Sequence, residues 1–416
     1  MSFDYAALRR RPDVEAPNLQ AWDATDELLV EHALAAGVDG SRIAVIGDEY
    51  GAITLALTDA GFSGIRVHQD LATGRRALAR NADELGLAGF SSHELDDGLL
   101  AGARLVLLQL PKALADLEEI ADAVARWATP DVALVAGGRV KHMTLTQNEV
   151  LGRCFASVQA QRAVRKSRLV VATGAQAVAD APYPVRASVP VPSRDAPIEV
   201  VAHGAAFAGA KLDIGTRVLL EVMGELEADG FDSRTLAQPA SSAAAVAASA
   251  RRPTGGAPAT GVASDGRSDP RPELRVVDLG CGTGILATAF ALNHPEALVT
   301  ATDRSAAAAA SARATAAANG VTDRVTVTLD DAGSELPDAA ADLILLNPPF
   351  HLGQSVHAGA ATRLFEAAAR LLRPGGALLT VFNSSLAYRA ELTRLIGPTQ
   401  QLHRTTKFTV TRSIRR

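Results

Sequence analysis

The chain has 416 residues, enough for two or three domains with large cores, and its 48% hydrophobic and 21% charged residues are typical of a soluble globular protein. The net charge of -5 argues against a strongly basic nucleic-acid-binding protein, so any RNA contact must come from local patches. Two cysteines, Cys154 and Cys281, are too few for a disulfide framework, and no stretch approaches the length of a membrane span. We therefore expect a cytoplasmic protein with no membrane association.

Strands and helices are predicted to alternate along the first half of the chain, which is the pattern of a parallel sheet covered by helices. After a polar leader that contains Arg9–Arg11, the predicted elements are a helix at Leu19–Ala36, a strand at Ile43–Gly47, a helix from Ala52, a strand at Ile65–His68, a helix at Leu71–Leu87, a strand at Leu105–Leu110, a helix at Ala113–Trp127 and a strand at Val132–Ala136. Two strand-like segments, Phe155–Val164 and Leu169–Ala172, are expected to close this unit as a hairpin.

A segment of different composition separates the two halves. Residues Ser241–Arg271 are rich in Ala, Ser, Gly, Pro and Thr and lack bulky apolar side chains, so they cannot bury enough surface to order themselves. We predict a disordered insertion at about 241–271, between a helix at Gly215–Ala228 and the next strand. The alternative is that part of it, Ala243–Ala250, forms a helix.

The second half repeats the plan of the first. The predicted elements are a strand at Val276–Leu279, a glycine-rich loop and a helix, a strand at Leu298–Thr302, a helix at Ser305–Asn319, strands at Val325–Leu329 and Leu343–Leu346, a helix at Thr362–Leu372 that stops at Arg373–Gly376, a strand at Ala377–Phe382, a helix at Leu386–Ile396 and a strand at Lys407–Ile414.

The two halves also correspond residue by residue, at nearly equal spacing. Gly47 aligns with Gly280, Gly51 with Gly284, and Leu105–Pro111 with Leu343–Pro349. We infer a tandem duplication of one α/β domain. The N-terminal copy is degenerate as a site, because three positions have changed: Val45 stands for Asp278, Glu49 for Gly282 and Gln109 for Asn347.

A cofactor site is predicted around the loop that follows the strand at Val276–Leu279. Gly280, Gly282 and Gly284 let the backbone turn sharply and let a ligand approach the peptide planes. Such a loop alone is weak evidence, since nicotinamide and flavin folds carry similar ones. Asp278, however, would repel a pyrophosphate and attract the cationic amino-acid part of S-adenosyl-L-methionine.

Two further acids follow neighbouring strands and complete this expected site. Asp303 is placed to accept both ribose hydroxyls, and Asp331 could accept from the adenine amine, with Asp330 as its nearest rival. The alternative role for all these aspartates is ordinary capping of the helices that follow the strands. Cys281 is expected to fill space in the loop rather than to act as a nucleophile.

The strand at Leu343–Leu346 runs directly into Asn347–His351. Pro348 and Pro349 forbid both helix and strand pairing, so a stiff open loop is expected at the carboxyl end of a central strand, where open α/β sheets bind ligands. A rigid turn that merely contains Asn347 and Phe350 is the alternative.

These motifs resemble a known family. Asp278–Gly284 with Asp303 and Asn347–Phe350 resembles the class I S-adenosylmethionine-dependent methyltransferases that act on exocyclic amines. The segment Asn347–His351, the degenerate copy and the tail Phe382–Tyr388 with Lys407–Phe408 resemble the bacterial ribosomal RNA guanine-N2 methyltransferases. Three segments are most similar to the large-subunit (23S) enzymes of that group: Leu19–Ala24, Leu110–Lys112 and Leu212–Gly215.

The resemblance covers nearly the whole chain except Ser241–Arg271, and Ser384–Ser385 departs from it where basic or polar residues are commoner. It implies an α/β fold of two tandem Rossmann-like class I methyltransferase domains, each with a seven-stranded sheet. The N-terminal domain (1–200) would be a degenerate RNA-binding scaffold, and the C-terminal domain (201–416) would carry catalysis.

The resemblance also implies the chemistry. Asn347 Oδ1 and the Pro348 carbonyl would accept the N–H groups of a guanine amine and stabilise the charge that develops on methyl transfer. Pro349 stiffens the loop, and Phe350 would stack on the target base. No dedicated general base is assigned, because His351 is expected to satisfy a backbone carbonyl. No metal-binding spacing is present.

Ribosomal RNA is the expected partner, bound by a monomer through basic patches that could equally be solvated faces. The candidate residues are Arg139, Lys141, Arg162, Arg165, Lys166, Arg168, Arg404, Lys407, Arg412, Arg415 and Arg416. Three alternatives remain open: guanine-N2 methylation of small-subunit (16S) RNA, methylation of an adenine N6 or a glutamine amide, and a non-catalytic RNA-binding or assembly protein with a vestigial fold.

Overall fold

The computed structural model describes residues 3–176, 179–192, 194–228, 273–349 and 357–416. The insertion predicted at 241–271 lies outside these ranges. The chain divides into two compact units. Unit 1 comprises Met1–Arg186, Val201–Gly209 and Arg304–Ser311, and unit 2 comprises Ala187–Val200, Ala210–Asp303 and Ala312–Arg416. Within the described ranges, none of the helices combines the length and the hydropathy that crossing a bilayer requires.

Unit 1 is built on a seven-stranded sheet with the order β3-β2-β1-β4-β5-β7-β6. All neighbouring pairs are parallel except those made by β7, which is antiparallel to β5 and β6. The strands are β1 (Ile43–Ile46), β2 (Ile65–His68), β3 (Phe90–His93), β4 (Leu105–Gln109), β5 (Ala133–Arg139), β6 (Phe155–Ala160) and β7 (Ser167–Ala175).

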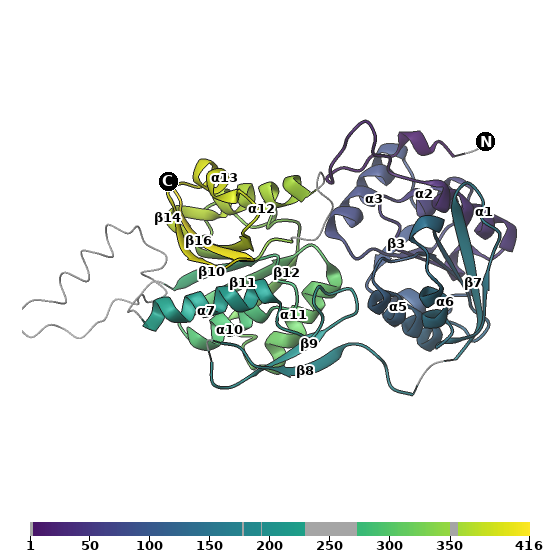
Figure 1. The fold of residues 1–416 in the computed structure, drawn as a ribbon. Coiled ribbons are helices and arrows are strands. Elements are labelled where there is room, and N and C mark those ends of the chain that lie inside the picture. The colour runs from purple at the N-terminus through teal and green to yellow at the C-terminus, as the bar shows by residue number, and fades with distance from the viewer. Residues whose placement is uncertain (1–2, 177–178, 193, 229–272, 350–356) are drawn as a thin grey trace, which may run out of the picture. The chain divides into compact units, whose positions relative to one another are not determined.

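Helices cover both faces of this sheet (Figure 1). They are α1 (Ala24–Ala36), α2 (Ala52–Asp59), α3 (Ala72–Leu85), α4 (Asp97–Leu100), α5 (Leu114–Trp127) and α6 (Leu145–Leu151), with short 3-10 turns at Tyr5–Ala7, Gly40–Arg42 and Val140–His142. Successive strand residues point to opposite faces, so Ile43 and Val45 pack with α1, α2 and α3, while Ala44 and Ile46 pack with α4, α5 and α6. The unit therefore has two separate hydrophobic cores.

Unit 2 repeats this arrangement with the order β12-β11-β10-β13-β14-β16-β15, in which β16 is the antiparallel strand. The strands are β10 (Leu274–Leu279), β11 (Ala297–Asp303), β12 (Val325–Leu329), β13 (Ala341–Leu346), β14 (Leu372–Asn383), β15 (Thr399–Arg404) and β16 (Phe408–Ile414). The two sheets have the same strand order, as a duplicated domain requires, and the expectation of seven strands in each half is confirmed.

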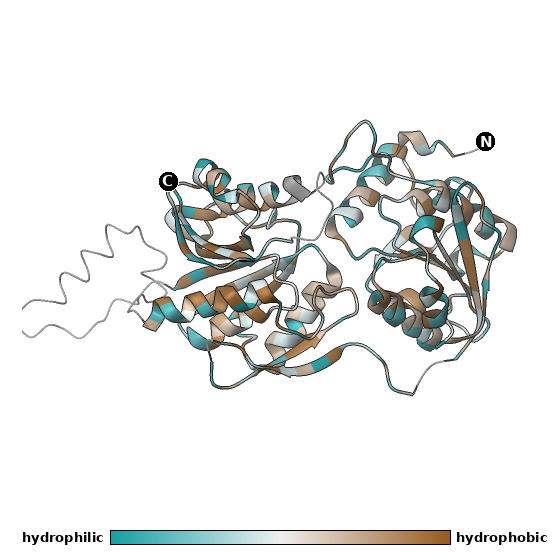
Figure 2. Ribbon diagram, viewed as in Figure 1, coloured by the Kyte–Doolittle hydropathy of each residue, from teal (hydrophilic) through white to brown (hydrophobic). Residues whose placement is uncertain are grey.

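Two cores again lie on opposite faces of the sheet. The helices are α7 (Ile214–Ala228), α10 (Ile285–Asn293), α11 (Ala306–Ala318), α12 (His357–Leu371) and α13 (Tyr388–Leu395). Val276 packs with α7, α10 and α11, and its neighbour Val277 packs with α12 and α13. Figure 2 shows hydrophobic segments along α7 and along strands of both sheets. Because β10 pairs in parallel with β11 and with β13, the carboxyl ends of these three strands lie at one edge of the sheet.

Several element boundaries differ from the predictions for local physical reasons. The first helix begins at Ala24 rather than Leu19, because Asp23 caps it in a reciprocal capping box with Asp26. The expected stop at Arg373–Gly376 lies inside β14, where it appears as a register shift: Leu372 pairs with Ala341, and pairing resumes with Ala377 opposite Leu343.

Four strands of the structure have no counterpart among the predicted elements. The strands β3 and β15 lie at sheet edges and are rich in Ser, Gln and Thr, so their burial pattern carries no hydrophobic alternation. The strands β8 (Val185–Val189) and β9 (Ile198–Ala202) form a separate two-stranded sheet in the connection between the two seven-stranded sheets.

Candidate active site

The loop after β10 makes the turn that its glycines predicted. Gly280 and Gly282 adopt φ values of +82° and +54°, in the left-handed region that glycine tolerates best. The N–H groups of Gly280 and Cys281 donate to the carbonyl of Thr302 on β11, at 2.8 and 3.0 Å. A Cβ added at Gly280 or Gly282 would meet no atom within 4 Å, so the outer side of this loop is open to a ligand.

Gly284 serves a different purpose in the same loop. A Cβ at this position would lie 2.9 Å from both Cα and Cβ of Ala312 on α11. Gly284 precedes the first residue of α10, and its N–H donates to the carbonyl of Cys281 at 2.9 Å. Its small size therefore lets α10 begin directly against α11, which holds the loop at the sheet edge.

Asp278 is buried at the end of β10 with only 1% of its surface exposed. Its Oδ2 accepts from the backbone N–H of Ala287 at 3.0 Å, whereas its Oδ1 has no partner among the described residues. Burial, opposed by this hydrogen bond and aided by the charge of Asp303, raises the pKa of Asp278 to about 7. An orphaned carboxylate oxygen beside an open glycine loop fits a ligand that brings a cationic donor, as the amino group of S-adenosylmethionine would.

Asp303 ends β11, the neighbour of β10, and holds the glycine loop itself. Its Oδ2 accepts from the N–H of Gly282 at 2.9 Å. Cys281, between Gly280 and Gly282 in the chain, is buried, and burial together with the nearby Asp303 raises the pKa of its thiol well above the ordinary value. The protonated thiol is a poor nucleophile, which agrees with the expected space-filling role.

The two aspartates after β12 have different surroundings. Asp330 accepts from Ser334 Oγ at 2.6 Å and from the N–H of Glu335 at 2.8 Å, so its carboxylate stabilises the following turn. Asp331 instead forms an ion pair with Arg363 of α12. Of the two, Asp331 is the one whose carboxylate pairs with a cation from another element, whereas the oxygens of Asp330 bond within the turn that follows it. Arg363 was not among the expected site residues.

Asn347 follows the last residue of β13. Its Nδ2 donates to Asp213 Oδ2 at 2.7 Å and to Thr216 Oγ1 at 3.0 Å, and its Oδ1 is buried with no hydrogen-bond partner among the described residues. A buried acceptor left unsatisfied costs about 1–3 kcal/mol, so this atom is poised to accept from a ligand. Pro348 is buried and Pro349 is exposed, while Phe350 and His351 lie outside the described residues.

The structure thus brings Asp278, Asp303 and Asn347 to one edge of one sheet, since β10 pairs in parallel with both β11 and β13. Sequence reasoning missed Asp213 and Thr216, which contact Asn347 from more than 130 positions away. The sequence feature that could have indicated them is the group of polar residues at the start of the helix before the first strand of each copy, which is α1 in unit 1 and α7 in unit 2.

The corresponding loop of unit 1 carries larger side chains. Arg10 of the leader lies over the ring of Tyr50, 4.6 Å from Cζ to the ring centre, and the Tyr50 hydroxyl donates to Asp13 at 2.8 Å. Glu49 stands at the position of Gly282, and the buried Tyr50 stands at that of Thr283. Unit 1 therefore lacks the open glycine loop of unit 2.

The basic patches expected to contact RNA are partly neutralised. Arg165 forms ion pairs with Glu27 and Glu31, and Arg139 lies 3.9 Å from Asp23. No group of three or more His, Cys, Asp or Glu side chains in the described part of the chain is arranged to hold a metal ion.

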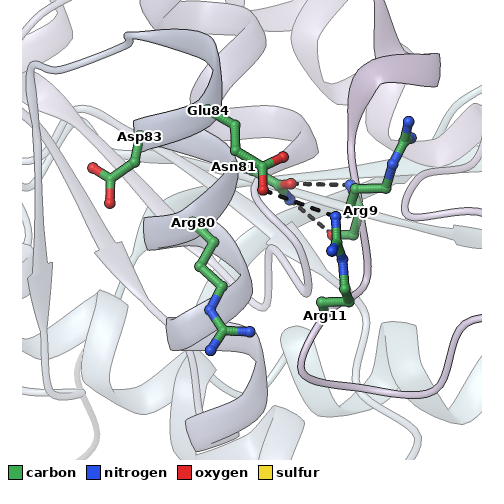
Figure 3. Close-up of a pocket in the computed structure, with 6 residues that line it drawn as sticks. All are labelled: Arg9, Arg11, Arg80, Asn81, Asp83 and Glu84. Atoms are coloured by element: carbon green, nitrogen blue, oxygen red, sulfur yellow. Dashed lines mark hydrogen bonds and ion pairs between the residues drawn. The ribbon is translucent and has the colours of Figure 1, made fainter.

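A cavity of about 360 Å³ on unit 1 presents other arginines. Figure 3 shows it between the leader, which carries Arg9 and Arg11, and helix α3. Arg9 donates its backbone N–H to Asn81 Oδ1 at 2.9 Å, and Arg11 lies 3.9 Å from Glu84. The guanidinium of Arg80 has no hydrogen-bond or ion-pair partner among the described residues.

Two protein-family models match the chain, the RLMG N-terminal domain over residues 1–176 and the Methyltransferase small domain over residues 268–412. The ribosomal RNA large subunit methyltransferase G of Pseudomonas syringae pv. tomato is 32% identical over 409 residues, covering 97% of this chain and 96% of its own. The protein of that name from Streptomyces coelicolor is 32% identical over 414 residues, covering 98% and 97%.

Among solved structures, the fold resembles that of the T. thermophilus 16S rRNA N2 G1207 methyltransferase in complex with AdoMet and guanosine. The TM-score is 0.68 at 18% identity, and the match covers 95% of this chain and 92% of the other. At this identity the likeness shows the fold alone.

Proposed function

Because the chain belongs to the ribosomal RNA large subunit methyltransferase G family, we propose that it transfers a methyl group from S-adenosylmethionine to the exocyclic N2 of a guanine in large-subunit (23S) ribosomal RNA. The catalytic unit is unit 2, and the site is the sheet edge formed by β10, β11 and β13.

The observation that carries this proposal is the buried, unpartnered Oδ1 of Asn347. A guanine amine is a poor nucleophile, because its lone pair is delocalised into the ring. Asn347 Oδ1 and the carbonyl of Pro348 each accept one N–H, which favours a pyramidal nitrogen and stabilises the positive charge that develops on it. Phe350 stacks on the target base and Pro349 keeps the loop stiff.

Three acids would hold the cofactor, which when bound supplies an electrophilic methyl group bonded to a sulfonium sulfur. Asp278 Oδ1 would accept from its ammonium group, Asp303 would accept from the ribose hydroxyls, and Asp331 would accept from the adenine amine. The glycines at 280 and 282 let the cofactor approach the backbone, because their outer side is open. Gly284 holds the loop in place.

The reaction needs positioning more than proton transfer. The carbon–nitrogen bond forms as the sulfur–carbon bond breaks, and one N–H proton leaves the methylated amine for water. No general base is assigned. Unit 1, which carries Glu49 in place of Gly282 and Gln109 in place of Asn347, serves as a scaffold that contacts RNA phosphates.

The test is to incubate the purified protein with unmodified 23S and 16S ribosomal RNA and labelled S-adenosylmethionine, and then to map the labelled nucleotide. Label at a guanine N2 of 23S RNA is expected. Label in 16S RNA alone would show that small-subunit RNA is the substrate. Label at an adenine would contradict the guanine assignment.

The variant Asn347→Ala separates an enzyme from a vestigial fold in the same assay. It should abolish turnover while calorimetry shows nearly normal cofactor affinity. A wild-type protein that neither binds the cofactor nor labels any RNA would be a non-catalytic RNA-binding or assembly protein.

A further inference from the structure

The side-chain amide of Asn347 has only one chemically consistent orientation. Its Nδ2 lies 2.7 Å from Asp213 Oδ2 and 3.0 Å from Thr216 Oγ1. A carboxylate can only accept hydrogen bonds, so the NH2 group must face Asp213 and the carbonyl oxygen must take the other position, beside Gly215, where an added Cβ would lie 2.8 Å from it. This oxygen is the buried, unpartnered Oδ1.

Asp213 is itself held firmly. It lies directly before α7, and the same Oδ2 accepts from the backbone N–H of Thr216 at 3.0 Å, while its carbonyl accepts from the N–H of Arg217 at 2.9 Å. The carboxylate therefore caps the first turn of α7 and contacts Asn347 at the same time. This arrangement ties the amide of the catalytic loop to a helix packed in the core of unit 2.

Unit 1 contains a related contact. Gln109, at the position equivalent to Asn347, donates from Nε2 to the carboxyl group of Asp26 in the first turn of α1. In each unit, a side-chain amide at the end of the central strand thus donates to an acid at the start of the helix that precedes the first strand. Unit 1 thus has this amide-to-acid contact although its glycine loop has changed.

We propose that Asp213, assisted by Thr216, is a positioning residue that fixes the amide of Asn347 with Oδ1 directed at the methyl acceptor. This inference rests on the proposed function, because it concerns the same reaction. Asp213 does not contact the reacting atoms. It removes the flipped state of the amide, in which an NH2 group would face the guanine amine and oppose its two N–H donors.

The first test is Asp213→Asn, which preserves the size and the helix cap, since Asn is an equally good cap. Either end of an amide at 213 can face Asn347, so the flipped state becomes available. We expect kcat to fall about 100-fold, as for other small misplacements at reacting centres, with an unchanged KM for S-adenosylmethionine and an unchanged melting temperature.

The second test is a reciprocal exchange. Asn347→Asp alone places two carboxylates at hydrogen-bond distance, so their repulsion should remove activity. The double variant Asp213→Asn with Asn347→Asp restores a donor facing a carboxylate and again leaves one acceptor oxygen at 347. Its kcat should exceed that of Asn347→Asp by at least about tenfold, a coupling typical of residues in contact.

The outcomes separate this inference from the function on which it rests. A wild-type protein without RNA methylation in the parallel assay would overturn both. If the wild type is active, then wild-type kcat in Asp213→Asn, or a double variant no better than Asn347→Asp, would overturn the positioning role alone. If the melting temperature of Asp213→Asn falls together with its kcat, then Asp213 acts only as a helix cap.

Discussion

Gly215 leaves the space that Asn347 occupies: a Cβ built at Gly215 would lie 2.8 Å from Asn347 Oδ1 and 3.2 Å from its Cγ. Real Cβ atoms do not approach so closely, so a larger residue here must displace the amide. The start of α7 thus affects the site in two ways. Gly215 has no Cβ and so leaves room for the amide of Asn347, and Asp213, which precedes the helix, binds the NH2 group of that amide.

Replacing Gly215 with alanine should therefore impair catalysis more than folding. We expect Gly215→Ala to lower kcat by roughly 100-fold through displacement of Asn347 Oδ1, with little change in cofactor affinity. Gly224→Ala is a matched control on the same helix, because a Cβ at 224 would meet no atom within 4 Å. The control should keep full activity and gain about 0.5–1 kcal/mol in the free energy of unfolding. Equal kcat values in the two variants would contradict the close approach.

Cofactor binding should depend on pH through Asp278. Its pKa is raised to about 7, chiefly by burial, so the carboxyl is ionised above this pH and protonated below it. Only the ionised form attracts an ammonium group, so affinity for S-adenosylmethionine should weaken by about tenfold per pH unit as pH falls below 7. Calorimetry across this range measures the slope.

Asp278→Asn is the control for that dependence. It should weaken cofactor binding at high pH by roughly 10- to 100-fold, the typical value of a charge-assisted hydrogen bond. Its affinity should no longer change across the range near pH 7. If the variant keeps the wild-type slope, another group is responsible for it.

Unit 1 should lose stability as pH rises, because Asp26 is buried with Asp48 nearby. Burial, followed by the charge of Asp48, raises the pKa of Asp26 from 3.8 to about 8. The folded state then holds a proton that the unfolded state releases, so the free energy of unfolding falls by at most about 1.4 kcal/mol per pH unit from this group. The loss runs from the unfolded pKa up to about 8 and levels off above it.

Tryptophan fluorescence during urea unfolding of the full chain can follow this effect. Both tryptophans of the chain, Trp22 and Trp127, belong to unit 1. The asparagine in Asp26→Asn resembles the protonated acid, so this variant should show a smaller pH dependence of the unfolding free energy. The pH dependence that remains is attributed to Asp48, whose pKa is also raised by burial. An unchanged pH profile would show that Asp26 is ionised in the folded protein.

Arg80 should contribute more to RNA affinity than Arg165. The guanidinium of Arg165 is already engaged by Glu27 and Glu31, whereas that of Arg80 has no hydrogen-bond or ion-pair partner in the described ranges. If unit 1 contacts RNA through the cavity beside α3, Arg80→Ala should reduce the slope of log affinity against log salt concentration by about one counterion. Arg165→Ala should change it less, and the reverse order would place the RNA elsewhere.

The sequence by itself determined the repeated α/β plan and the sheet edge at which the proposed site residues lie. Apolar runs such as Leu343–Leu346 mark strands buried on both faces, and residues that end parallel strands must meet at one sheet edge. Asp278, Asp303 and Asn347 could therefore be assigned to one site before any coordinates were known. Their neighbours along the chain carry the local signals that end strands, namely glycine and proline.

The tertiary structure alone decided how these side chains are held. Asp213 lies 134 positions from Asn347, and no local pattern links them, because the contact exists only once α7 packs beside β14. The same holds for Arg363, which reaches Asp331 from α12, and for Asp330, whose oxygens are taken by the next turn. Hydrophobic periodicity specifies which face of an element is buried, but the partner of a polar side chain depends on which elements the packed core brings together.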